Sequence, residues 1–151
     1  MLTVKIEGTN VVIENLGSLS KDMPGILDNA LQRVAKGIFR SAFAWLSGAK
    51  TPAGAYPVPI VTGHLRRGLD WLNPGESKST ETGAYAAGKH EVVIYDSAIY
   101  ADPIFEGKSS SAKFGPRNAL IDGLNRFNAS VGIEKTIEDE LQKEIAKRGL
   151  E

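Results

Sequence analysis

The sequence predicts an α+β fold in which a mainly antiparallel sheet packs on one long amphipathic helix, with further helices at the C-terminus. Three observations predict it: β-branched segments near the N-terminus and around residue 92, an unbroken helical periodicity that reaches Leu46, and two amphipathic patterns after residue 116. Strands and helices come in blocks, which favours an α+β fold over parallel βαβ units. A chain of 151 residues corresponds to a single domain, 1–151.

The N-terminal segment predicts a β-hairpin. Residues 2–6 and 11–14 are rich in β-branched and apolar side chains, and the turn-forming residues 7–10 lie between them. A helix is expected to begin at Asp22, because an aspartate accepts hydrogen bonds from free backbone N–H groups. The nearby Pro24 suits a first helical turn, where no N–H donor is needed.

The helix that follows carries the strongest periodic pattern in the chain. Its apolar residues recur at spacings of three or four. A helix from Asp22 to Leu46 would be roughly 35 Å long, so we expect it to span the whole molecule with a sheet along one side. Ser47 and Gly48 provide the stop. The apolar stripe consists of Leu27, Leu31, Val34, Ile38, Ala42 and Trp45.

The central part of the chain predicts two loops and two strands. Residues 49–61 carry three prolines and predict a flexible loop, and residues 61–72 predict a short turn or helix followed by a strand. Residues 73–89 are polar and rich in glycine and serine, which predicts either a mobile loop or a protruding hairpin arm. The uninterrupted apolar run Val92–Tyr95 is typical of a central strand that is covered on both faces.

The C-terminal part predicts a short helical turn, a flexible loop and two helices. The turn spans Ser97–Ala101 and stops at Asp102–Pro103, because the residue before a proline disfavours helical backbone. The loop is expected at 107–113, and the helices at about Pro116–Phe127 and Glu134–Lys147. The last helix shows an apolar stripe of Ile133, Ile137, Leu141 and Ile145, and two surface pairs, Asp139 with Lys143 and Glu144 with Arg148.

The composition excludes several classes of protein. Lysine plus arginine and aspartate plus glutamate each total 18, so no bulk charge draws the chain to nucleic acid or to a membrane. The absence of cysteine excludes disulfides, thiolate catalysis and cysteine-ligated metals. No apolar run approaches the length of a membrane span, and the N-terminus lacks the apolar stretch of a signal peptide. We therefore expect a soluble protein that is intracellular when it is synthesised.

The sequence predicts no catalytic, metal or cofactor site. The two histidines, His64 and His90, lack a metal-binding spacing and are expected to be ordinary surface or interface residues. Asp96, Asp102 and Glu106 lie near one another in the sequence. However, Asp96 ends a strand and Asp102 precedes a proline, and both are common turn positions. A small hydrolase or nuclease that uses Asp96, Asp102 and His64 is the alternative from another class.

Basic residues lie in or beside the predicted loops and would form a basic rim if those loops converge. No helix-turn-helix, RRM or zinc-finger pattern accompanies them, so sequence-specific recognition of nucleic acid is not expected. A non-specific DNA-binding module that contacts phosphates is a further alternative. The basic residues are Arg66, Arg67, Lys108, Lys113, Arg117 and Arg126.

Three short motifs follow the long helix: Pro-Val-Pro-Ile-Val-Thr-Gly-His-Leu-Arg-Arg-Gly-Leu at 57–69, Ser-Ala-Ile-Tyr-Ala-Asp-Pro-Ile-Phe-Glu-Gly at 97–107, and Phe-Gly-Pro-Arg-Asn-Ala-Leu at 114–120. With these motifs in this order, the chain resembles the tail-completion or minor tail proteins of long-tailed bacteriophages over roughly residues 2–147. In that family a Pro-x-x-Thr-Gly-x-Leu-Arg stretch follows the long helix. A Tyr-Ala segment then runs into a Glu-Phe-Gly-like turn, and an Arg-Pro-Phe-Leu-like segment begins the last helix.

The resemblance implies a structural virion protein of a tailed phage or prophage, with no enzymatic activity and no cofactor. It implies a homo-oligomeric ring, expected to be hexameric, that completes the tail at the neck and joins it to the head. Tail-terminator and head-closure rings are near relatives that the motifs do not separate. The implied partners are other copies of the chain, neighbouring head-closure, tail-terminator or tail-tube proteins, and genomic DNA in the channel through non-specific contact. The implied location is the virion, after assembly in the host cytoplasm.

The resemblance also implies where the chain meets its partners. Residues of the first two motifs are candidates for subunit contacts, and the basic residues in and beside the loop at 107–113 are candidates for a docking loop or for the DNA channel. Leu65, Tyr100, Ile104 and Phe105 suit the core equally well, because core and interface residues look alike in a sequence. The interface candidates are Thr62, Gly63, Leu65, Arg66, Arg67, Tyr100, Ile104, Phe105 and Glu106, and the docking or DNA candidates are Lys108, Lys113 and Arg117.

Overall fold

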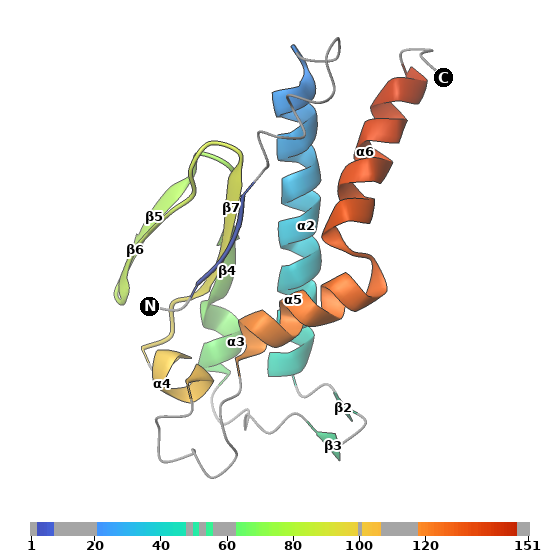
Figure 1. The fold of residues 1–151 in the computed structure, drawn as a ribbon. Helices are drawn as coiled ribbons and strands as arrows, with labels where there is room; N and C mark the ends of the chain where they lie inside the picture. Colours follow the sequence, from blue (N-terminus) through green and yellow to red (C-terminus); the bar gives the residue numbers. More distant parts are fainter. Residues whose placement is uncertain are drawn as a thin grey trace.

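A three-stranded antiparallel sheet and one long helix lie side by side in the computed structural model (Figure 1). The sheet has the order β1 (Thr3–Glu7), β7 (Glu91–Asp96), β4 (Leu69–Leu72), and α2 (Met23–Leu46) packs along one of its faces. Further helices follow towards the C-terminus, so the predicted α+β class is confirmed. The structure describes residues 3–7, 21–47, 50–51, 54–55, 63–99, 101–106 and 118–147.

The central strand, β7, is buried on both faces, as the apolar run predicts. Val92 and Ile94 belong to the main core, which α2 dominates. Val93 and Tyr95 alternate with them, and therefore point to the other face of the sheet, where they form a second apolar cluster with Leu72. The sheet thus has no face that is left to water along β7.

A hairpin of β5 (Ser77–Thr80) and β6 (Gly83–Ala86) covers the second face of the sheet (Figure 1). Its Tyr85 ring stacks on the Tyr95 ring with 4.0 Å between the ring centres. The Tyr85 hydroxyl donates a hydrogen bond of 3.3 Å to the backbone carbonyl of Asp96. Of the two predicted forms of this polar segment the hairpin is correct, but it folds back over the sheet instead of protruding.

The long helix begins and ends where the sequence predicts. Pro24 lies in its first turn, and the backbone N–H of Ser47 donates to the carbonyl of Phe43 at 2.9 Å to close its last turn. Asp22 occupies the N-cap position, but its side chain makes no capping hydrogen bond, so that part of the prediction is wrong. Its backbone is already helical, whereas a capping side chain reaches the N–H groups from an extended backbone.

Helix α5 (Ala119–Ser130) crosses α2 near the C-terminal end of α2 (Figure 1). The two backbones come close at Gly123, where a Cβ atom would lie 2.8 Å from the backbone nitrogen of Ala42. The Phe127 ring of α5 packs directly on Gly37 of α2, where an added Cβ atom would overlap the ring. The crossing therefore depends on a glycine from each helix.

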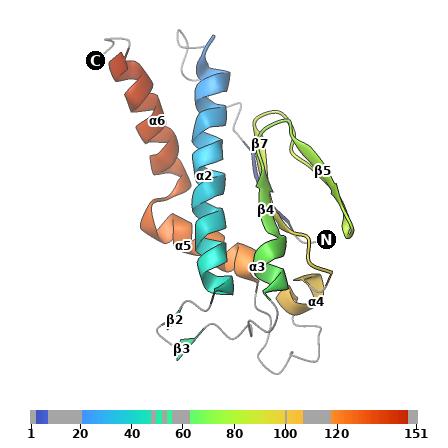
Figure 2. The same cartoon turned by 180° about the vertical axis from the view of Figure 1, so that it is seen from behind.

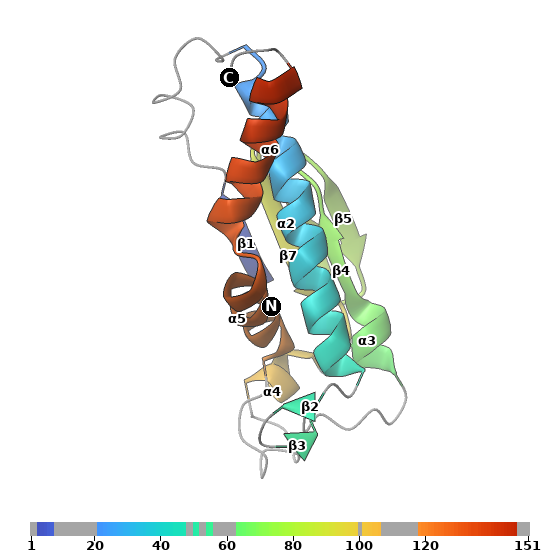
Figure 3. The same cartoon turned by 90° about the vertical axis from the view of Figure 1, so that its right-hand side faces the viewer.

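Helix α6 (Ile133–Lys147) runs back along α2 in the opposite direction (Figure 3). Its buried residues are Thr136 and Glu140, whereas the apolar stripe that the sequence predicts is only half-buried. Glu140 is paired with Arg33 of α2, whose Nη1 atom lies 2.7 Å from the Glu140 Oε2 atom.

The surface pairs on α6 differ from the predicted ones. Asp139 pairs with Lys135 and not with Lys143, and Glu144 pairs with Lys147. The predicted partner of Glu144, Arg148, lies outside the described residues.

Removing Arg33 from its ion pair with Glu140 is expected to destabilise the protein. The variant Arg33→Met would leave the Glu140 carboxylate buried without its partner, at a cost of about 1–3 kcal/mol, since Arg33 itself is half exposed. The double variant Arg33→Met/Glu140→Leu should recover most of that loss, because an apolar pair needs no counter-charge. Urea unfolding of both variants measures this, and a double variant as unstable as the single one would contradict it.

Of three other predicted elements, the N-terminal hairpin stays a prediction and two differ from the structure. The partner of β1 is β7, with Thr3 opposite Tyr95, and residues 11–14 of the predicted hairpin lie outside the described residues. The short helix α4 (Ala101–Phe105) begins where the predicted turn ended, because Pro103 fits its first turn, where no N–H donor is needed. Helix α5 begins after Asn118, whose Oδ1 atom accepts the N–H groups of the next residues, and not at residue 116.

The predicted loop at 49–61 contains a short ladder between β2 (Lys50–Thr51) and β3 (Gly54–Ala55). The predicted loop at 107–113 lies outside the described residues. Within the described part of the chain, no helix combines the length and the apolar character that crossing a membrane requires.

Candidate functional site

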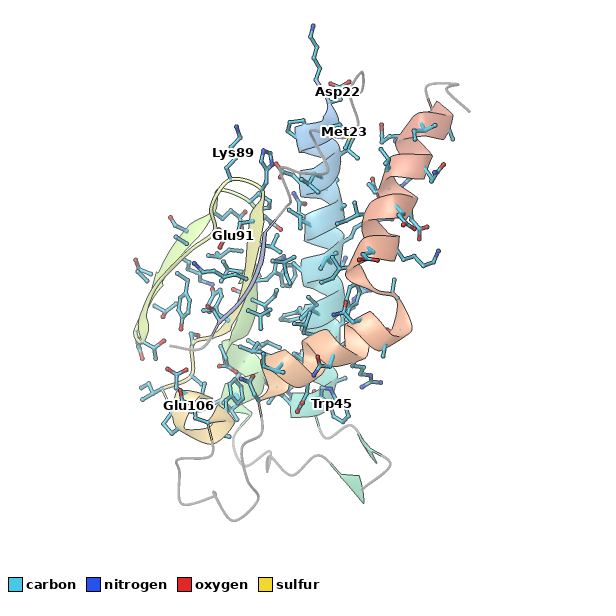
Figure 4. The ribbon with its side chains drawn as sticks, in the orientation of Figure 1. Asp22, Met23, Trp45, Lys89, Glu91 and Glu106 are labelled. Carbon is cyan, nitrogen blue, oxygen red and sulfur yellow. The ribbon has the colours of Figure 1, made fainter. Side chains whose placement is uncertain are left out.

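The described parts of the three sequence motifs meet at one end of the molecule. The short helices α3 (His64–Gly68) and α4 lie beside the beginning of α5, at the end where α2 finishes (Figures 1 and 2). Leu65, Phe105 and Leu120, one from each motif, belong to the same buried cluster as Leu46 of α2. Figure 4 shows Glu106 and Trp45 at this end, with Lys89 and Met23 at the other. We call it the motif end.

The first motif turns into α3 through a glycine in a left-handed conformation. Gly63 has a φ of 69°, which only glycine adopts at little cost, and it is the N-cap of α3. The next turn buries Leu65 and leaves Arg66 and Arg67 towards solvent. The Arg66 guanidinium lies 5.6 Å from the centre of the Phe43 ring on α2, a cation–π contact that holds it in place.

The second motif forms α4, and it buries one of its two large apolar residues. Phe105 is 2% exposed and Leu65 of the first motif is 7% exposed. Both are core residues, which is one of the two environments that the sequence left open for them. Ile104 is half-buried against the core, and Glu106 is exposed.

Some of the remaining candidates lie at the surface of the motif end, and the others lie outside the described residues. Gly63, Arg66, Arg67, Ile104 and Glu106 lie at the surface or partly exposed. The interface candidates Thr62 and Tyr100, and the docking or DNA candidates Lys108, Lys113 and Arg117, lie outside the described residues.

The carboxyl group of Asp96 is buried at the end of β7. Its Oδ1 atom accepts the backbone N–H of Ala98 at 2.9 Å, which closes the turn after the strand, and its Oδ2 atom has no hydrogen-bond partner among the described residues. Burial raises the pKa of this carboxyl from 3.8 to about 7; the Ala98 hydrogen bond opposes the rise, and the charge of Asp102 adds to it. Asp96 therefore fills the turn role that its position after a strand indicates.

The two histidines have different surroundings. His64 is the exposed first residue of α3. The His90 side chain is only 11% exposed, and its Nδ1 atom lies 2.7 Å from the Asp28 Oδ1 atom of α2, so it is not an ordinary surface histidine. No group of three or more histidine and acidic side chains that could hold a metal ion occurs within the described residues.

Sequence reasoning missed a surface on α2 that combines cations with aromatic rings. Phe39 stacks with Phe43 at 5.8 Å and lies 4.8 Å from Trp71 of β4, measured between ring centres. Lys36 and Arg40 lie exposed on the same helix. The signal was present in the sequence, since α2 carries no acidic residue after Asp28.

Comparisons with protein-family models, with curated proteins and with solved structures find no match for this chain.

Proposed function

We propose that this chain is a structural subunit of the neck of a tailed phage or prophage, where it forms a ring that completes the tail and joins it to the head. Tail-terminator and head-closure rings are the alternative positions for such a subunit. The proposed location is the virion, and the proposed partners are other copies of the chain and the proteins of the adjacent rings.

The observation that carries the proposal is the convergence of the three motifs at the motif end. The order and spacing of the motifs along the sequence do not require them to meet in space. The ribbon nevertheless brings α3, α4 and the beginning of α5 together at one end of the molecule (Figures 1 and 2). Each contributes one residue to the main core, Leu65, Phe105 and Leu120, and Arg66, Arg67 and Glu106 are partly or fully exposed beside them. Docking onto a neighbouring ring requires a surface that several segments, each anchored in the core, hold in place.

The mechanism of such a subunit is geometric. A contact between two different surfaces of one chain repeats around an axis and closes a ring when the rotation fits. The motif end would face an adjacent ring, and the exposed Arg67 and Glu106 supply charges of both signs for that contact.

The first test is the mass and shape of the purified protein. Light scattering after size-exclusion chromatography, with negative-stain imaging of each peak, is expected to give a discrete ring. The second test is a phage deleted for this chain, which should accumulate separate heads and tails. Deletion phage that still join heads to tails would contradict the proposal.

The variant Asp102→Asn separates the structural function from a hydrolase or nuclease that uses Asp96, Asp102 and His64. A ring subunit should complement the deletion phage with little loss, because Asp102 lies at the surface of the first turn of α4. The measurement is the titre of infectious particles beside that of the unaltered chain. Hydrolysis of DNA by the unaltered chain that disappears in Asp102→Asn would favour the enzyme.

A further inference from the structure

The solvent-facing side of α2 forms a cationic and aromatic surface. Lys36, Arg40 and Phe43 follow one another at spacings of four and three, which places them on one side of the helix. Arg66 joins them through its contact with the Phe43 ring. We call these four residues the α2 face. In Figure 2 this helix lies in front and α5 passes behind it, so α5 packs on the side away from this face.

The cations of the α2 face differ from the other basic residue of α2 in the partners that the described residues offer them. Within the described part of the chain, neither Lys36, Arg40 nor Arg66 forms an ion pair with a carboxylate. Arg33, two turns before Arg40 on the same helix, differs because it is paired with Glu140. Three positive charges therefore stand uncompensated around a phenylalanine that is 39% exposed.

A surface of opposite character lies on α5 and α6. Ile121 and Val131 are large apolar residues that are 43% and 49% exposed. Glu134 and Glu138 are exposed, lie one turn apart, and have no cationic partner among the described residues. Each stands two positions before a buried residue of α6, about 200° around the helix, so both project away from α2. We call these four residues the α5–α6 face.

The two faces lie on different sides of the molecule. Helix α5 crosses in front of α2 in Figure 1 and behind it in Figure 2, which is turned by 180°. The residues of α5 that are buried against the core include Gly123 and Phe127, and Ile121 is not among them. One copy can therefore present its α2 face to a second copy while its own α5–α6 face stays free.

We propose that the α2 face of one copy of this chain binds the α5–α6 face of the next copy. Lys36 and Arg40 would meet Glu134 and Glu138, and Phe43 would pack against the exposed apolar residues. The inference rests on the proposed function, because a ring needs a head-to-tail contact between two different faces of one chain. It adds to that function the surfaces through which the subunits join.

A second copy fits the α2 face better than nucleic acid does. The exposed ring of Phe43 gains by burial against apolar side chains such as Ile121 and Val131, whereas a phosphate backbone offers no such surface. The whole chain has no net charge, so the positive face is balanced by negative charge elsewhere on the same molecule. Arginine and aromatic residues are also enriched at the centres of protein interfaces.

Charge reversal on each face tests the proposal. Lys36→Glu/Arg40→Glu and Glu134→Lys/Glu138→Lys alter exposed residues, and circular dichroism checks that both variants fold. Each variant alone is expected to self-associate on the order of a hundredfold more weakly than the wild type, because like charges then face each other. An equimolar mixture of the two should associate again, since the reversed faces are complementary. Sedimentation velocity over a concentration series measures all three samples.

The matched control is Lys21→Glu/Lys89→Glu, which makes the same change of charge at two exposed residues. Lys89 and Asp22, the chain neighbour of Lys21, lie at the end of the molecule away from the motif end (Figure 4). The control should leave association unchanged. Three results would each overturn the proposal. The first is association of Lys36→Glu/Arg40→Glu as strong as that of the wild type, and the second is a mixture of the two variants that does not associate. The third is a wild-type chain that is monomeric at every concentration. Loss of binding to a labelled DNA duplex in Lys36→Glu/Arg40→Glu, with assembly intact, would assign the face to nucleic acid instead. A chain that assembles through these faces but is dispensable for joining heads to tails would contradict the proposed function alone.

Discussion

The variant Gly123→Ala is expected to lower the free energy of unfolding by about 1–3 kcal/mol. The added Cβ atom would lie 2.8 Å from the backbone nitrogen and 3.0 Å from the Cα atom of Ala42. Both atoms belong to the backbone of α2 near its C-terminal end, and a helical backbone cannot rotate away as a side chain can. The strain therefore falls on the crossing of α5 over α2, and urea unfolding of the purified variant measures it.

The matched control is Gly25→Ala, a glycine in the first turns of α2 with no atom within 4 Å of the added Cβ. There the same change should stabilise the protein by up to about 1 kcal/mol, since alanine favours helix more than glycine does. Equal stability of Gly123→Ala and the wild type would show that the two helices can separate at this point without loss.

Replacing Asp96 by asparagine is expected to stabilise the protein at neutral and alkaline pH and to have little effect below pH 4. The pKa of this carboxyl is raised from 3.8 to about 7. Between these two values the folded protein holds a proton that the unfolded chain has released, so the free energy of unfolding falls as the pH rises. The difference between the two pKa values corresponds to a loss of at most about 4 kcal/mol in the free energy of unfolding.

Asparagine keeps the oxygen that accepts the Ala98 N–H but cannot ionise. The difference in unfolding free energy between Asp96→Asn and the wild type should therefore grow from about pH 4 to pH 7 and then level off. Thermal unfolding in a series of buffers measures it, with Asp139→Asn on the exposed side of α6 as the control. A difference that does not change with pH would mean that Asp96 is ionised at every pH where the protein folds.

The elements that the sequence predicts well are those whose signal is local. The periodicity of α2, the apolar run of β7 and the passage from α3 into β4 each depend on neighbouring residues, and each appears near its predicted place. The pairing of β1 with β7 was missed because it joins segments far apart in the sequence, and no local pattern selects that partner over the nearest strand.

The candidate site could be predicted only in part for a related reason. The motifs indicated which segments to compare, and Gly63 of the first motif has a left-handed backbone conformation at the start of α3. Leu65 and Phe105 were left open between core and interface, because a sequence does not distinguish these two environments, and the structure buries both. The α2 face was missed because a helix surface is exposed only where no other element covers it. The sheet and α5 cover the other sides of α2 through contacts between residues far apart in the sequence.

The central place of β7 also determines the order in which this protein can fold during synthesis. Both β1 and β4 pair with β7, with Thr3 opposite Tyr95, so neither strand can take its place in this sheet until the ribosome has released residue 96. Helix α2 is made long before that point and must wait with its apolar side exposed to water. Such distant pairing costs loop entropy before it is repaid, so sheet closure, rather than helix formation, should limit the folding rate and set the time during which a nascent chain can aggregate.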